Sequence, residues 1–340
     1  MEYSKMTSER ARETVETLYG FKVASVSKLN SYNDLNFLIS TEDGNKFTLK
    51  VTSNSAGQLE SLTTIIDVLN LLVKNGIKVS EPVPTKTGNI IQTDEQENIN
   101  IILLKYLSGK LLENIPVKQN QLNDIAFECG KLFGQINQIL ITYPVNDSHT
   151  RLELSWNLLN TSATHKNIPF IEDKDLQKLC KDVMAKFEEE VLTKLSSLRK
   201  GLIHGDANTS NIIMQQLLGG DGMDQCWGVC GVIDFGDSHC SYCVFEVAIM
   251  LTYLMVKAVK CNCDMFTVAE YGLKGYQTVL PLGDKEKDIL YIVIAQRCVQ
   301  SLSSASKEIC DQPENTDYIM MDFSAVKTVL LNVKDRIKLV

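Results

Sequence analysis

The strongest constraint on the fold is a polar stretch, HGDANTSN at residues 204–211, that lies between two short apolar runs. The run LI precedes it and the run IIM follows it, so both indicate short buried strands that end at this loop. A further run, VCGVI at residues 229–233, leads directly into the sequence DFGD at residues 234–237. The chain is therefore expected to hold several polar side chains rigidly at strand ends beside a core.

Asp206, Asn211 and Asp234 supply two carboxylates and one carboxamide at these strand ends. Such a set suits phosphoryl transfer, because one Asp can accept the proton of an attacking hydroxyl while the Asn and the other Asp bind magnesium. An Asp-Gly pair alone is usually a turn, and Asp-Phe-Gly alone occurs by chance. The combination is far more specific, and it predicts a phosphotransferase site.

At these residues the chain resembles the aminoglycoside phosphotransferase and choline kinase-like branch of the protein-kinase-like fold. The resemblance implies an α+β fold with a small antiparallel-sheet lobe, residues 1–106, and a larger, mainly helical lobe, residues 107–340. Nucleotide and two magnesium ions are expected in the cleft. Carried over residue by residue, Asp206 is the catalytic base, and His204 supports the loop. Asn211 and Asp234 are metal ligands.

The composition limits the class of partner. The net charge is −8 and the pI about 5.2, which speaks against a nucleic-acid or anionic-membrane surface and favours a small cationic substrate. The ten cysteines are too scattered for a disulfide scaffold, and the first residues carry no apolar signal segment. We expect a cytoplasmic protein with reduced thiols. The pairs at residues 240–243 and 261–263 could be zinc ligands, but buried free cysteine is the favoured interpretation.

Period and turn signals predict the elements of both lobes. In the first lobe we expect a helix at residues 9–19, strands at 23–29, 35–40, 46–51, 89–93 and 100–107, a break at the proline pair 82–84, and an amphipathic helix at 59–74. In the second we expect helices at 122–140, 173–198 and 244–256, helical stripes after 285, and a glycine-rich loop at 219–222. Glu246 is expected to fix the lobe behind the site.

Four parts of the first lobe are candidates for nucleotide binding. Ser31 lies in a turn without glycine that either binds phosphate oxygens or is simply exposed. Lys50 places one ammonium on an apolar strand, where kinase-like folds hold the α- and β-phosphates, and this is favoured over an exposed edge lysine. Glu60 either pairs with Lys50 or lies exposed in the first helical turn. The segment 103–109, with Leu104 and Tyr106, corresponds to the hinge, whose backbone meets the purine.

Two residues of the second lobe are candidates for substrate contact beside Asp206. Trp156 either borders the substrate site or anchors the lobe. Asp237 ends the second polar loop and could receive a substrate cation.

Several further segments, at residues 31–37, 156–157, 189–195, 244–248 and 313–315, resemble the hydroxylysine kinases of this family, over nearly the whole chain. That resemblance implies transfer of the γ-phosphoryl group of GTP, with ATP possible, to the 5-hydroxyl of 5-hydroxy-L-lysine. Without this resemblance, the residues indicate only a small-molecule hydroxyl kinase that binds a purine nucleotide and Mg²⁺. No nucleic-acid or membrane partner is expected, and the oligomeric state is left open.

Two alternatives remain at this stage. One is a kinase for another cationic alcohol, such as an aminoglycoside or choline, because the acidic charge suits these substrates equally well. The other is a nucleotide-binding pseudokinase that acts through a partner. Loss of a motif residue is the usual mark of that class, whereas Lys50, Asp206, Asn211 and Asp234 are all present.

Overall fold

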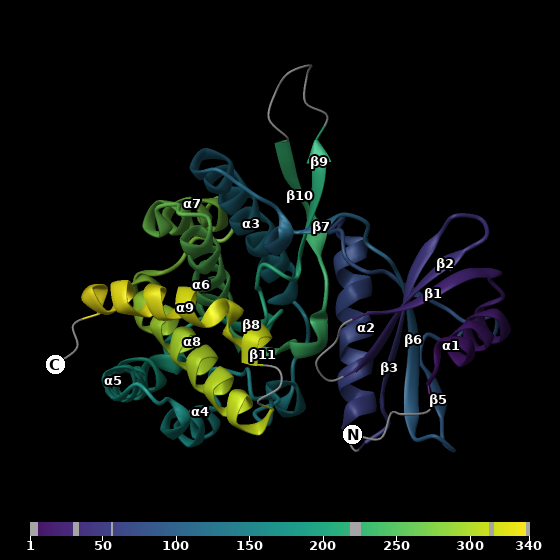
Figure 1. Cartoon of the computed structure of the whole chain (residues 1–340), viewed down its shortest axis with the longest axis horizontal. Helices are drawn as coiled ribbons and strands as arrows, with labels where there is room; N and C mark the ends of the chain where they lie inside the picture. The colour runs from purple at the N-terminus through teal and green to yellow at the C-terminus, as the bar shows by residue number, and fades with distance from the viewer. Residues whose placement is uncertain (1–5, 30–33, 56, 218–225, 313–315, 338–340) are drawn as a thin grey trace. The chain divides into compact units, whose positions relative to one another are not determined.

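The computed structural model describes residues 6–29, 34–55, 57–217, 226–312 and 316–337. By its internal contacts the chain divides into two compact units, residues 1–108 and 109–340, and each is described by itself (Figure 1). Ser31 and the predicted loop at 219–222 lie outside the described residues. An antiparallel sheet in the first unit and a largely helical second unit make the fold α+β, as predicted.

The first unit is built on a six-stranded antiparallel sheet with the order β1-β2-β3-β6-β4, in which β5 also pairs with β6. The strands are β1 (Val23–Leu29), β2 (Leu35–Thr41), β3 (Lys46–Ser53), β4 (Pro82–Val83), β5 (Gln92–Asp94) and β6 (Ile99–Lys105). Lys50 lies opposite Asn36 of β2 and Ile102 of β6, so it belongs to an interior strand and not to an edge.

Alternating side chains of β6 serve the two faces of this sheet. Ile101 and Leu103 join a buried cluster with α1 (Ser8–Thr14) and with the π-helical turn Val15–Tyr19 that continues it. Ile102 packs on the other face against α2 (Gln58–Lys74), the amphipathic helix expected at residues 59–74. Figure 1 shows α1 and α2 on opposite sides of the sheet.

Two predictions for the first unit need correction. Pro82 and Val83 do not simply break the chain but form β4, which pairs with Leu104 and Leu103 at the sheet edge. Proline is tolerated in an edge strand because its missing N–H is not needed for a hydrogen bond to a neighbouring strand. The strand expected at residues 89–93 is short, because Asn89 closes a turn with Thr85 instead, and β5 begins only at Gln92.

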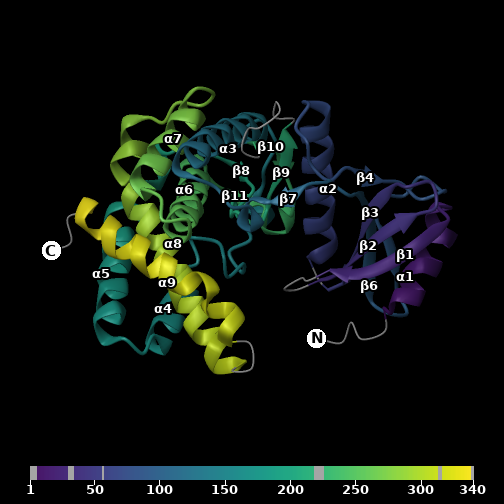
Figure 2. The ribbon, with the colours of Figure 1, turned by 45° about the horizontal axis from the view of Figure 1, so that its top comes forward.

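The second unit combines two small groups of strands with helices, and β7, β9 and β10 lie at one side of these helices (Figure 2). Its strands are β7 (Lys110–Leu111), β8 (Lys200–Ile203), β9 (Ile212–Leu217), β10 (Cys226–Val232) and β11 (His239–Tyr242), paired as β10-β9-β7 and β11-β8. Its helices are α3 (Gln119–Leu140), α4 (Thr161–Asn167), α5 (Lys174–Glu190), α6 (Cys243–Lys260), α7 (Met265–Gln277), α8 (Asp284–Asp311) and α9 (Thr316–Val333).

Helix α6 is the centre of this unit. It is buried from Cys243 to Ala258 and packs against α3, α7, α8 and α9, as expected for a helix that is apolar on all sides. The helix predicted at residues 173–198 instead ends at Glu190, and the chain continues as a 3₁₀ segment, Leu192–Ser197. Within the described ranges, no helix has the length and apolar character needed to cross a bilayer.

Candidate active site

Two strand pairs hold the polar loops in place. β8 ends at Ile203, directly before His204, and β9 begins directly after Asn211, so the loop 204–211 joins two strands as predicted. β10 pairs with β9, and it ends shortly before Asp234. The second loop lies between β10 and β11. Because β10 pairs with β9 and β11 pairs with β8, both ends of the second loop are joined to the strands that flank the first loop.

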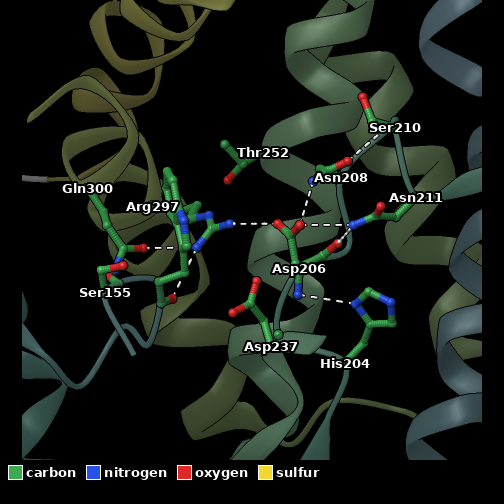
Figure 3. A network of polar contacts seen from close by, with 12 residues as sticks. Ser155, His204, Asp206, Asn208, Ser210, Asn211, Asp237, Thr252, Arg297 and Gln300 are labelled. Carbon is green, nitrogen blue, oxygen red and sulfur yellow. Dashed lines mark hydrogen bonds and ion pairs between the residues drawn. The ribbon is translucent and has the colours of Figure 1, made fainter. Parts of the chain in front are cut away.

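Asp206 is the centre of a polar network (Figure 3). Its Oδ2 accepts hydrogen bonds from Nδ2 of Asn208, at 2.7 Å, and from Nδ2 of Asn211, at 2.9 Å. Its Oδ1 accepts one from Nη2 of Arg297 on α8, at 3.0 Å. With 22% of its side chain exposed, this carboxylate is held by three donors and still reaches solvent.

His204 ties the Asp206 loop to the end of β10. The side chain is fully buried, and its Nδ1 accepts the backbone N–H of Asp206 at 3.2 Å. The other ring nitrogen must then carry the proton, and it lies 2.9 Å from the carbonyl of Ile233. The ring also meets Phe235 edge-on, with the centroids 4.5 Å apart. Through these contacts His204 links the backbone of the Asp206 loop to the end of β10.

Gly205 and Glu246 fix the backbone of the same loop. Gly205 has a φ of +82°, and a Cβ there would lie 2.5 Å from the carbonyl oxygen of Asp237, so glycine is needed on both grounds. The Glu246 side chain on α6 is fully buried, and its Oε2 accepts the backbone N–H groups of His204 and, at 3.3 Å, Gly205. Burial raises the pKa of this carboxyl, whereas His204 and the two N–H groups act in the opposite direction.

Glu246→Ala should destabilise the second unit, because two buried N–H groups lose their acceptor. The expected loss is about 1–3 kcal/mol for each group left unpaired, which urea unfolding measures. Glu246→Gln is the matched control, since its amide oxygen can accept the same two bonds. An Ala variant as stable as the natural protein would contradict this role for Glu246.

Asn211 and Asp234 fit a magnesium site by their chemistry. Within the described part of the chain, the two side-chain hydrogen bonds of Asn211 both use its nitrogen, which donates to the carbonyl and to Oδ2 of Asp206, so the amide oxygen remains for a cation. Asp234 has a φ of +60°, and its Oδ1 accepts the N–H of Gly236, which directs the exposed carboxylate at the end of β10. Two oxygen ligands from protein, completed by phosphates and water, are typical of Mg²⁺.

Asp237 lies among the charges of the site. Burial raises its pKa to about 6, the negative charges of Asp206 and Asp234 act in the same direction, and Arg297 and Arg151 oppose the shift. Figure 3 shows its carboxylate on the same side of the loop as the Asp206–Arg297 pair. A cation beside such a partly buried carboxyl group would stabilise its ionised form.

Arg297 and Arg151 are site residues that the sequence reasoning missed. Nη1 of Arg151 donates to the carbonyls of Gly236 and Ser238, at 2.8 and 2.9 Å, and so holds the loop that carries Asp237. Arg297 had a usable signal, because it closely follows an apolar run of α8 at residues 289–295, and a buried guanidinium requires an anionic partner.

Trp156, predicted to border the substrate or to anchor the lobe, contacts Arg297. Its carbonyl oxygen accepts a hydrogen bond from Nη1 of Arg297 at 3.2 Å, and its ring lies 4.7 Å from the guanidinium carbon. The residue therefore belongs to the network around Asp206.

The nucleotide candidates belong to the first unit. The side chain of Lys50 is 15% exposed, and its Nζ lies 2.8 Å from Oδ2 of Asp34. Glu60 is exposed in the first turn of α2, and its pairing with Lys50 stays a prediction. Leu104 lies in β6, and Tyr106 follows that strand, with its N–H bonded to the carbonyl of Lys46.

The cysteines form no metal centre within the described ranges. All ten lie in those ranges, and each is free. No group of three or more His, Cys, Asp or Glu side chains there could hold a metal ion. Burial raises the pKa of Cys180 and of Cys243 to about 12, so these two thiols are neutral.

Known proteins of similar sequence were found over almost the whole chain. The profile of the phosphotransferase enzyme family matches residues 25–282. Hydroxylysine kinase of Xenopus laevis is 31% identical over 331 residues, which cover 93% of this chain and 86% of the relative.

Solved structures agree on the fold. An amicoumacin kinase, determined in complex with AMP-PNP, Ca²⁺ and Ami, has a TM-score of 0.68 at 17% identity, and the match covers 98% of this chain and 94% of that kinase. The GDP complex of an aminoglycoside 2'-phosphotransferase has a TM-score of 0.60 at 15% identity, with coverages of 96% and 99%. The kinase-like fold expected from the sequence is thus confirmed. With its sequence matched to this family and to hydroxylysine kinases over most of its length, the chain belongs to the phosphotransferase enzyme family, in its hydroxylysine kinase group, and transfers phosphoryl groups to an alcohol acceptor.

Proposed function

We propose that this phosphotransferase moves the γ-phosphoryl group of GTP to the 5-hydroxyl of 5-hydroxy-L-lysine, giving 5-phosphohydroxy-L-lysine and GDP. The observation that carries the proposal is the Asp206 carboxylate, which three donors hold at a strand end while it still reaches solvent. Similarity to hydroxylysine kinase over 93% of the chain supports the substrate. Proteins with this fold were determined with GDP and with AMP-PNP, so the choice of GTP rests on the resemblance to hydroxylysine kinases.

Asp206 acts as the catalytic base. The substrate oxygen forms a bond to the γ-phosphorus while the bond from that phosphorus to the β,γ-bridging oxygen breaks, and the hydroxyl proton moves to the Asp206 carboxylate. His204 and Glu246 do not touch the substrate. They hold the loop backbone, so that the carboxylate meets the hydroxyl at a fixed angle.

The metal and the nucleotide have separate ligands in this proposal. The amide oxygen of Asn211 and the carboxylate of Asp234 hold Mg²⁺, which neutralises charge on the transferring phosphates. In the first unit, Lys50 contacts the α- and β-phosphates, and the backbone at Leu104 and Tyr106 meets the purine. By resemblance to kinase-like folds, we also assign Ser31 to phosphate binding and Glu60 to an ion pair with Lys50.

Asp237 is the proposed counterion of the substrate's side-chain ammonium. Its carboxyl is buried beside Asp206, with a pKa raised to about 6, and a bound ammonium favours the ionised form of such a group. Since the ammonium of 5-hydroxylysine lies on the carbon next to the hydroxyl, an acid close to the base suits it. Trp156 provides an apolar border for the methylene chain.

The substrate assignment makes a testable prediction. With GTP and Mg²⁺, 5-hydroxylysine should release GDP, whereas lysine should bind without reacting, because it lacks only the nucleophilic oxygen. Lysine should inhibit competitively, with binding weaker by about 1–3 kcal/mol for the unpaired polar group left in the site. Coupled detection of GDP, with lysine as the varied inhibitor, measures both.

Choline and an aminoglycoside serve as controls, and both should be poor substrates because they lack the amino-acid head group. If either gave a kcat/KM equal to or above that of 5-hydroxylysine, the specific assignment would fall and only a general alcohol kinase would remain. Nucleotide binding with no turnover of any of these alcohols would instead favour a pseudokinase. Parallel assays with ATP test the choice of donor.

A further inference from the structure

The charged side chain of Arg297 is buried, so contacts with its surroundings must offset the loss of its hydration. The side chain is fully buried on α8, just after the apolar run at residues 289–295, and moving a cation out of water is costly unless it is paired. A buried ion pair contributes little net stability, because desolvation offsets the attraction between the charges. The partner here is Asp206, the proposed catalytic base, so Arg297 lies where it can act in the reaction.

The guanidinium is fixed on several sides. Nη1 donates to the carbonyl of Trp156, at 3.2 Å, and to Oε1 of Gln300, at 2.9 Å. Gln300 is itself held, since its amide nitrogen donates to the carbonyl of Ser155 at 2.8 Å (Figure 3). The rings of Trp156 and Tyr253 lie 4.7 and 5.4 Å from the guanidinium carbon. Arg297 cannot turn away from Asp206 without breaking these contacts.

The contacts of Asp206 decide which of its oxygens is available. Each carboxylate oxygen offers about two acceptor positions. Among the described residues, Oδ2 fills both of its positions with Asn208 and Asn211, whereas Oδ1 fills one with Arg297. A substrate hydroxyl can therefore donate to Oδ1 without displacing a bond. The oxygen that remains for the proton is thus the one that Arg297 holds.

We propose that Arg297 is a positioning residue for phosphoryl transfer, which fixes Oδ1 of Asp206 in the orientation that receives the substrate hydroxyl. The inference rests on the proposed function, in which Asp206 is the base. Arg297 acts through Asp206, by the direct contact of Nη2 with Oδ1, whereas the donors Asn208 and Asn211 hold only Oδ2.

Arg297→Met tests this role directly. It keeps an unbranched apolar side chain on α8 but removes the donor, so kcat should fall by about 10²-fold, the cost typical of a misplaced catalytic group. The affinity for magnesium–GTP, measured by calorimetry, should stay near that of the natural protein, because Asp234 and the first unit are unchanged. Arg297→Lys keeps the charge without the planar fork and should lie between the two.

Chemical rescue separates positioning from mere support of the fold. In Arg297→Ala the truncated side chain leaves space beside Asp206, and added guanidinium ion at low, non-denaturing concentration should raise kcat. The matched control is Arg199→Ala, which removes another Arg–carboxylate pair of the same unit, Nη2 of Arg199 to Oε2 of Glu286 at 2.7 Å. That variant should keep its kcat and gain nothing from guanidinium.

The outcomes distinguish the inference from the proposed function. A kcat loss in Arg297→Met and Arg297→Lys at preserved nucleotide affinity, with rescue of Arg297→Ala, supports positioning. If Arg297→Met, or Arg297→Lys where the Met variant does not fold, retains the natural kcat while Asp206→Asn is inactive, the inference falls and the function stands. If kcat, nucleotide affinity and melting temperature all fall together and guanidinium ion does not restore kcat, Arg297 has a structural role only. Full activity in Asp206→Asn removes both proposals.

Discussion

Asp206→Asn should abolish turnover while leaving nucleotide affinity nearly intact. The variant keeps the size of the side chain but loses the proton acceptor, and a positioned base contributes typically about 10²–10⁴-fold to the rate. It also sets a new NH₂ group among the donors Asn208, Asn211 and Arg297, so at least one of these contacts must rearrange. Steady-state kinetics give the loss in kcat, and calorimetry with magnesium–GTP gives the affinity.

Asn208 supplies a control for this experiment, because its amide contacts the same carboxylate at 2.7 Å but cannot accept the hydroxyl proton in its place. Asn208→Ala should therefore reduce kcat by less than Asp206→Asn does. Retention of more than about a tenth of the natural kcat by Asp206→Asn would remove Asp206 from the role of base.

Local pattern was sufficient for much of the fold. The strands β1, β2 and β3 follow from β-branched and apolar residues between turn signals, and α6 follows from a stretch that is apolar on every side. His204, Asp206 and Asn211 lie within eight consecutive residues, so the strands on each side bring them together whatever the rest of the chain does. These strands, the helix and the polar loop are determined by residues close together in the sequence, so they can be predicted from a single sequence.

The remainder depends on contacts between distant segments. Arg297 is 91 residues from Asp206, and only the packing of α8 in the second unit brings the two together. Glu246 was expected behind the site only through the family resemblance, and its contact with backbone N–H groups more than 40 residues away likewise depends on packing. The pairing of Pro82 with Leu104 was missed for a related reason, because a proline pair normally ends an element and only an available sheet edge turns it into a strand.

Asp234→Ala should weaken binding of the magnesium–nucleotide complex, in contrast to the change at Asp206. A hard cation loses a carboxylate oxygen, and the phosphates lose their bridge to the protein. Because the metal also stabilises charge in the transition state, by several kcal/mol in typical cases, kcat should fall as well. Calorimetry with GTP, in the presence and absence of Mg²⁺, separates the metal-dependent part of the affinity.

Asp234→Asn is the better matched variant, because Asp234 has a φ of +60° and Asn tolerates that backbone conformation more readily than Ala does. It also keeps an oxygen that can accept the N–H of Gly236, so the turn after β10 is preserved while the charge is lost. Both variants should lose the metal-dependent part of the nucleotide affinity, and Asn less than Ala. Unchanged metal-dependent affinity in both would show that Asp234 only shapes the turn, and Asn211 would then need another protein ligand beside it.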